Sequence, residues 1–146
     1  MSKLKLMKYK NYLTMIGALP GSQLFQHCYA VDENDQEIDT TNDGDSSCAL
    51  VVSWIIHGFG WIDAPHVTVE STVRELLKSG WRKTDQPKPG DVVHWPLNCD
   101  GHAHIGFYLG DSRFVSNNYK ARTPVLHDEV HRGNLPDVFY TRDYHI

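Results

Sequence analysis

A turn-rich polar segment changes abruptly into an apolar helical pattern near the middle of the chain, and this boundary constrains the fold more than any other feature. Residues 42–47 favour turns, whereas the residues from Cys48 to about His57 are apolar nearly all round. A helix that is apolar on every side must be covered on every side, so we expect the buried central helix of the domain here. Ser46 or Ser47 is placed to cap its first turn.

Cys48 would then lie in that first turn, where a thiolate is easiest to form. Free N–H groups and the positive end of the helix dipole stabilise an anion, and a nearby histidine would lower the thiol pKa below its usual value of about 8.5. Two interpretations stay open at this point. Cys48 is either a reactive nucleophile or a small buried side chain that begins a core helix, as most free cysteines are.

The order of the remaining patterns predicts an α+β fold. Residues 1–20 form a weakly amphipathic helix or arm, a short helix follows Ser22, and a helix over 69–79 is capped by Thr68. Short strand patterns follow at 92–95, 102–109, 113–117, 124–127 and 137–141. We therefore expect one domain over residues 1–146, with N-terminal helices and Cys48 at the start of a central helix packed on an antiparallel sheet.

Composition and charge exclude several classes of partner. The net charge is −4 with no long charged run, which argues against a nucleic-acid surface, and no apolar run approaches the roughly 18 residues of a membrane span. The 3 cysteines suit free thiols in a reducing compartment. Lysines interrupt the N-terminal apolar residues, so we identify no signal peptide and expect a cytoplasmic protein as encoded, or one exported by a non-classical route. We expect a monomer that needs no cofactor.

A cysteine nucleophile needs a base and a third group that orients the base. His104 is the best base, because it stands near the start of a strand behind a glycine-containing turn, where its ring can face a packed helix. The hairpin that follows identifies the third group. A two-residue turn at Gly110-Asp111 places Asn117 opposite His104, and a three-residue turn ending at Ser112 places Asn118 there.

A metal site is the competing chemistry at the same strand. Cys99, His102 and His104 lie close together in sequence, and the two histidines share one face of the strand. A structural zinc site needs a fourth ligand, which the sequence does not mark, so we expect no metal. Trp61 and Trp95 lie close to loops and are candidates to line a substrate groove.

Three segments resemble the signature blocks of the NlpC/P60 and CHAP papain-like cysteine hydrolases. They are Ser47-Cys48-Ala49-Leu50-Val51, Lys88-Pro89-Gly90-Asp91-Val92-Val93, and the run from His104-Ile105-Gly106-Phe107-Tyr108 through Gly110 to Val115. Their order and spacing match over roughly residues 44–120. The resemblance implies a papain-like fold and a hydrolase that cuts amide bonds in bacterial cell-wall peptides, as a peptidoglycan endopeptidase or amidase.

Carried over by position, the resemblance implies that Cys48 is the nucleophile and His104 the base. The family's third polar residue falls on Ser116, whereas the CHAP pattern would align both Ser116 and Asn118. Neither pattern is intact, and we choose Asn117 from the hairpin register, with Asn118 and Ser116 as alternatives. Tyr29 is the nearest counterpart of the family's oxyanion-supporting tyrosine.

Two other functions remain as alternatives. One is a catalytically silent module that binds cell walls or proteins, which the altered third position favours. The other is an intracellular thiol acyl-transferase or deamidase, which the absence of a recognisable signal favours.

Overall fold

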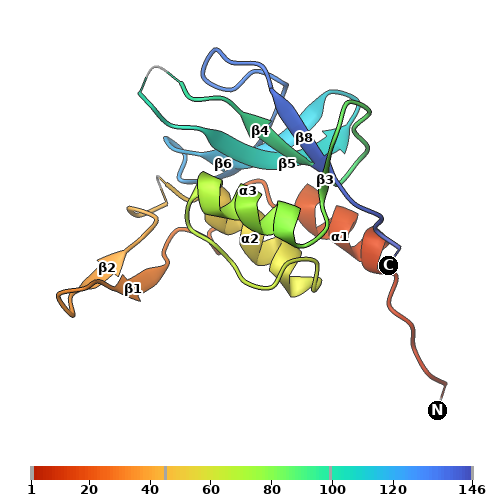
Figure 1. Ribbon diagram of the computed structural model, residues 1–146, viewed down its shortest axis with the longest axis horizontal. Coiled ribbons are helices and arrows are strands. Elements are labelled where there is room, and N and C mark those ends of the chain that lie inside the picture. Colours follow the sequence, from red (N-terminus) through yellow and green to blue (C-terminus); the bar gives the residue numbers. More distant parts are fainter. Residues whose placement is uncertain (1, 45, 99, 146) are drawn as a thin grey trace.

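The computed structural model describes residues 2–44, 46–98 and 100–145 and has an α+β fold, as the sequence predicts. Its described helices are α1 (Lys8–Gly17), α2 (Cys48–Gly58) and α3 (Val69–Lys78). Its described strands are β1 (Tyr29–Val31), β2 (Glu37–Asp39), β3 (Arg82–Thr84), β4 (Val92–Trp95), β5 (His104–Gly110), β6 (Arg113–Asn118), β7 (Thr123–His127) and β8 (Val138–Thr141). The helices cover one side of the larger sheet, and the β1–β2 hairpin projects away from the body of the molecule (Figure 1).

The larger sheet has the order β3-β8-β4-β5-β6-β7, and each neighbouring pair is antiparallel. This order puts β5 in the middle of the sheet and β6 and β7 beside it in turn. Side chains from these three strands can therefore lie together on one face of the sheet, although the residues are far apart in sequence. The described part of the chain contains no helix long and apolar enough to cross a membrane.

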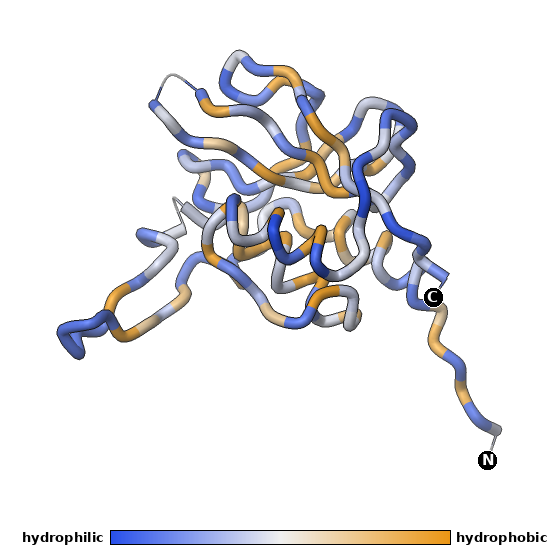
Figure 2. Tube along the Cα trace, viewed as in Figure 1, coloured by the Kyte–Doolittle hydropathy of each residue, from blue (hydrophilic) through white to orange (hydrophobic). Residues whose placement is uncertain are grey.

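Helix α2 is the central helix that the sequence predicts and is largely buried, but it is not covered on every side as expected, because Trp54 is 49% exposed. Six of its residues are buried, and Ala49, Val51 and Val52 lie in the main hydrophobic core with Ile105 and Phe107 of β5. Figure 2 shows hydrophobic segments gathered where the helices meet the sheet, and a hydrophilic tip on the β1–β2 hairpin. Burying an apolar side chain of this size stabilises a fold by about 1.5–3 kcal/mol, so α2 anchors the domain.

The expected serine cap of α2 is wrong. Ser47 occupies the N-cap position, but within the described chain its side chain makes no capping hydrogen bond. Its hydroxyl donates instead to the Phe25 carbonyl at 2.6 Å, because Ser47 is fully buried and that carbonyl lies beside it. The N–H groups of Cys48 and Ala49 at the start of α2 lie beside the Cys48 sulfur. In α3, by contrast, Thr68 accepts a hydrogen bond from the Ser71 N–H, as expected.

Two N-terminal predictions also differ from the structure. The residues after Ser22 form turns rather than a short helix, and they lead into the β1–β2 pair, which the sequence analysis did not predict. The aromatic and β-branched residues of the first strand favour an extended backbone over a helix. The sequence reading also missed β3, whose 3 residues are too few for a visible period but gain hydrogen bonds from β8.

Candidate active site

One cavity of about 680 Å³ is lined by most of the candidate catalytic residues that the sequence analysis names. The first residues of α2, α3 and β5 line it, together with one residue of β6 and parts of five loops. Cys48, His104 and Asn117 all contribute to its wall. His131 and Arg132, which the sequence analysis did not single out, contribute from the segment between β7 and β8.

Cys48 meets the sheet at the start of β5. The backbone N–H groups of Ile105, Ala49 and Cys48 itself lie beside the sulfur and act to lower the thiol pKa, but burial outweighs them and raises it. The side chain is half-buried, so part of it is reachable from the cavity. Cys48 in the unliganded protein is therefore a neutral thiol surrounded by N–H groups that can stabilise negative charge.

His104 is 8% exposed and is enclosed by aromatic rings. Its imidazole stacks on that of His131 with ring centroids 3.5 Å apart and planes 4° from parallel, and the Trp95 ring lies 5.3 Å away. Burial lowers the pKa of His104 well below its usual value, and the neighbouring His131 and His127 lower it further. His104 is thus a neutral imidazole at pH 7.

His104 and Cys48 approach the cavity from different sides of β5. His104 shares the strand face of Gly106 and Tyr108, whereas Ile105 and Phe107 point into the core under α2. The expectation that the His104 ring faces the helix therefore does not describe its position. Among the described residues no hydrogen bond joins Cys48 to His104. What the two residues share is the cavity, whose wall includes both of them.

Ser116 is the residue that holds the His104 ring. Its hydroxyl lies 2.8 Å from Nε2 of His104 and 2.7 Å from Nε2 of His127, and Nδ1 of His127 lies 2.7 Å from the Asp128 carbonyl oxygen. The third position that the family resemblance aligns with Ser116 is thus occupied by a hydroxyl with a second histidine behind it.

The register of the β5–β6 hairpin accounts for the placement of the two asparagines. Phe107 pairs with Val115, and the same register continued along the strands places Asn118 opposite His104. This is the register expected for the longer turn. It arises because the ladder shifts between Tyr108 and Gly110.

Asn117 therefore points to the opposite face from Ser116. Its Nδ2 donates to the Gly44 carbonyl at 2.8 Å, and its Oδ1 is buried without a hydrogen-bond partner in the described structure. Asn118 Oδ1 accepts from the N–H groups of Lys120 and Ala121. Neither amide contacts His104, and Asn117 instead anchors the loop that leads into α2.

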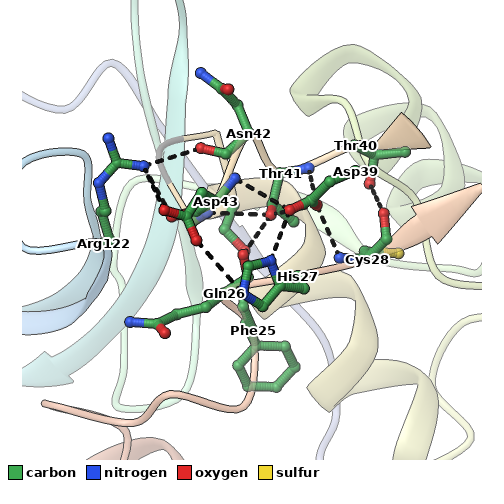
Figure 3. Close-up of polar contacts among 12 residues, drawn as sticks. Phe25, Gln26, His27, Cys28, Asp39, Thr40, Thr41, Asn42, Asp43 and Arg122 are labelled. Atoms are coloured by element: carbon green, nitrogen blue, oxygen red, sulfur yellow. Dashed lines mark hydrogen bonds and ion pairs between the residues drawn. The ribbon is translucent and has the colours of Figure 1, made fainter. Parts of the chain in front are cut away.

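A polar network fixes the start of that loop (Figure 3). Oδ1 of Asp39 accepts hydrogen bonds from the N–H groups of Cys28 and Thr41 and from the Thr41 hydroxyl, and Oδ2 contacts Nδ1 of His27 at 2.7 Å. Arg122 donates to the carbonyls of Asn42 and Asp43 from the turn between β6 and β7. The backbone that precedes Cys48 is thereby tied both to the hairpin and to the sheet.

The three aromatic residues expected to bind substrate lie elsewhere. Tyr29 is 63% exposed on β1 and stacks on His27, outside the wall of the cavity. Trp61 is buried in the main core against Tyr12. Trp95 is fully buried and packs against the His104 ring, so it supports the site from below its surface.

Only two of the three residues of the alternative metal site belong to the described structure. Cys99 lies outside the described residues, His102 is exposed, and the Nε2 atom of His104 is occupied by Ser116. No group of three or more His, Cys, Asp or Glu side chains suited to a metal ion occurs in residues 2–44, 46–98 and 100–145.

The sequence analysis missed His127 and His131. His127 ends a predicted strand, but its contact with Ser116 depends on the pairing of Val125 with Ser116, which no pattern in the sequence marks. Comparison of the chain with protein-family models and with curated proteins finds no match to either.

Proposed function

We propose that this chain is a papain-like thiol hydrolase of the NlpC/P60 type, with Cys48 as nucleophile and His104 as base. The observation that carries the proposal is the shared cavity. In it, a thiol at a helix N-terminus, bordered by three backbone N–H groups, faces the same space as a buried neutral imidazole held through Nε2. Neutral imidazole is the form that can accept a proton.

In the proposed reaction, a substrate amide enters the cavity and His104 takes the thiol proton at Nδ1 as the sulfur attacks the carbonyl carbon. The C–N bond then breaks, His104 returns the proton to the leaving amine, and an acyl-thioester remains on Cys48. Water, deprotonated by His104, hydrolyses the thioester and restores both groups. In this proposal the N–H groups of Cys48 and Ile105, which lie beside the sulfur, stabilise the oxyanion.

The substrate class rests on the resemblance of three sequence blocks to enzymes that cut cell-wall peptides. We propose a peptide of the bacterial cell wall, cleaved as by an endopeptidase or amidase. The cavity volume of about 680 Å³ falls within the range of small-molecule and peptide sites.

The second candidate is a binding module without turnover. Burial favours the neutral thiol of Cys48, and no hydrogen bond joins it to His104 in the described structure, so the unliganded site holds no preformed ion pair. A module that binds wall peptides in the same cavity needs no such pair.

The test is incubation of purified peptidoglycan with the wild type, Cys48→Ala and His104→Ala proteins, followed by measurement of new amino groups and of binding to insoluble peptidoglycan. Thiol hydrolysis predicts amine release by the wild type alone, and a mass increase on Cys48 when the reaction is quenched with acid. Equal binding by wild type and Cys48→Ala, with no amine release by either, would reject the hydrolase on this substrate and support the binding module.

Alkylation of the Cys48 thiol tests the proposed pair without any substrate. Its result therefore does not depend on peptidoglycan being the right one. Iodoacetamide modification of Cys48 at pH 7, followed by peptide mass spectrometry, should be slower in His104→Ala than in the wild type, with Cys28 as the internal reference. Equal rates in both proteins would count against a thiol and imidazole that act together.

A further inference from the structure

Three polar side chains follow one another across adjacent strands on the sheet face that carries Trp95. His104 lies on β5, Ser116 on β6 and His127 on β7. The Ser116 oxygen lies 2.8 Å from one ring and 2.7 Å from the other, so a single hydroxyl bridges two imidazoles. We call His104, Ser116 and His127 the imidazole relay.

The far end of the relay fixes the direction of every hydrogen bond in it. The Asp128 carbonyl can only accept, so Nδ1 of His127, 2.7 Å away, must carry the proton. A neutral imidazole has one N–H, which makes Nε2 of His127 an acceptor and Ser116 its donor. The Ser116 oxygen then accepts from Nε2–H of His104, and Nδ1 of His104 is left without a proton.

These hydrogen-bond directions require both His104 and His127 to be neutral, and their surroundings favour the neutral form. Burial is the main cause that lowers the pKa of His127 and of His104. Trp95 packs against both rings at centroid distances of 5.5 and 5.3 Å, and its own Nε1–H donates to the Glu129 carbonyl at 2.8 Å. Trp95 therefore excludes solvent from the relay without competing for its hydrogen bonds.

We propose that His127, acting through Ser116, is a positioning residue that fixes the tautomer of His104 and so leaves Nδ1 free to take the Cys48 proton. The effect on catalysis rests on the proposed function, whereas the tautomer of His104 does not. Experiments can therefore test the tautomer of His104 and the catalytic role of His127 separately.

The relay is tested by ¹⁵N NMR of the histidine ring nitrogens, whose shifts distinguish protonated from bare nitrogen. A His104→Gln spectrum assigns the His104 signals. In the wild type we expect His104 protonated at Nε2 and bare at Nδ1, and His127 protonated at Nδ1.

His127→Phe keeps a ring against Trp95 and Phe114 but removes the acceptor for the Ser116 hydroxyl. That hydroxyl loses the acceptor of its proton and can donate to Nε2 of His104 instead, so the Nδ1–H form of His104 should grow. His127→Gln supplies an amide oxygen near the position of Nε2 and should restore the wild-type pattern. His145→Phe, which changes an exposed histidine outside this face, is the matched control and should leave His104 unchanged.

A wild-type His104 protonated at Nδ1, or ring shifts that His127→Phe leaves unchanged, would overturn the relay. Amine release and Cys48 alkylation, measured on the same samples, address the proposed function separately. If the protein is a hydrolase, kcat should fall at least about tenfold in His127→Phe with little change in KM, and by no more than the roughly 10²–10⁴-fold that a general base supplies. The expected tautomers in a protein whose Cys48 is inert would reject the hydrolase and leave the relay standing.

Discussion

Gly106 and Ser116 lie so close together across β5 and β6 that the glycine position has no room for a side chain. A Cβ added at Gly106 would lie 2.6 Å from the Ser116 Cβ, 2.7 Å from the Val115 carbonyl oxygen and 3.3 Å from the Trp95 ring. The φ angle of Gly106 is not positive, so the requirement is steric rather than conformational. The missing side chain is what allows the Ser116 hydroxyl to reach between the two histidines.

Gly106→Ala should therefore displace Ser116 from His104. We expect a loss of about 1–3 kcal/mol in the free energy of unfolding, typical of overpacking in a close-packed core, and slower alkylation of Cys48. Urea denaturation and the iodoacetamide rate measure the two effects. Gly17→Ala is the matched control, because nothing lies within 4 Å of its added Cβ, and it should leave Cys48 unaffected. A Gly106→Ala protein as stable as the wild type would contradict the steric argument.

The carboxylate of Asp91 is fully buried and depends on Tyr144. Tyr144 donates its hydroxyl to Oδ1 at 2.6 Å, and the N–H of Lys88 donates to Oδ2 at 2.8 Å. Tyr144→Phe keeps the ring stacking but removes one donor, so we expect a loss of about 1–3 kcal/mol by urea denaturation. Tyr29→Phe changes a 63% exposed ring and should leave the free energy of unfolding unchanged. Equal stability of the two variants would count against the Asp91 contact.

Stability should fall as the pH drops from about 6.5 to about 4. Burial, with smaller contributions from His127 and Arg132, lowers the pKa of His131 to about 4, and the pKa values of His104 and His127 are lowered as well. Below about pH 6.5 these histidines bind protons in the unfolded chain but stay neutral in the folded protein. Protonation therefore stabilises the unfolded state relative to the folded one.

His131→Phe keeps a ring stacked on His104 and removes one of these titrating groups. Urea denaturation at pH 7, 5.5 and 4.5 should show a smaller loss in His131→Phe than in the wild type. His102→Gln, at an exposed position, should behave as the wild type does. A wild-type protein whose stability is unchanged over this range would contradict burial of the three neutral rings.

Asp39 should control the order of the loop before Cys48. Hydrogen bonds from the Cys28 N–H, from His27 and from Thr41 hold the pKa of its carboxyl well below the usual range, so the contribution of the network to stability is complete above about pH 4 and declines as the pH falls toward the lowered pKa. We expect Asp39→Ala to increase hydrogen exchange at the amides of Cys28 and Thr41, measured by mass spectrometry at pH 7. Glu33→Ala, an exposed change at the hairpin tip, is the control. Unchanged exchange at both amides would show that the Asp39 network does not order the loop.

The sequence predicted the elements whose signals are local. The apolar run from Cys48 has no alternative to a buried helix, the Thr68 cap acts within one turn, and the period of two over β5 follows from backbone geometry. The short strands β1, β2 and β3 carry too few residues for a period. They form because pairing partners supply their hydrogen bonds.

The arrangement of the site was decided by register and strand order. A shift of one residue turns a side chain to the other face of the sheet, and the irregularity between Tyr108 and Gly110 places Ser116, rather than Asn117, beside His104. The turn itself has positive φ angles at Asp111 and Ser112, a backbone choice that composition alone leaves open.

The sequence by itself determined that Cys48 begins a buried helix and that His104 lies on a strand with period two, because both follow from interactions between near neighbours in the chain. Only the tertiary structure decided that β7 lies beside β6, that His127 closes on Ser116, and that His131 stacks on His104. Those contacts join residues distant in sequence, and they depend on packing and register that no local pattern contains.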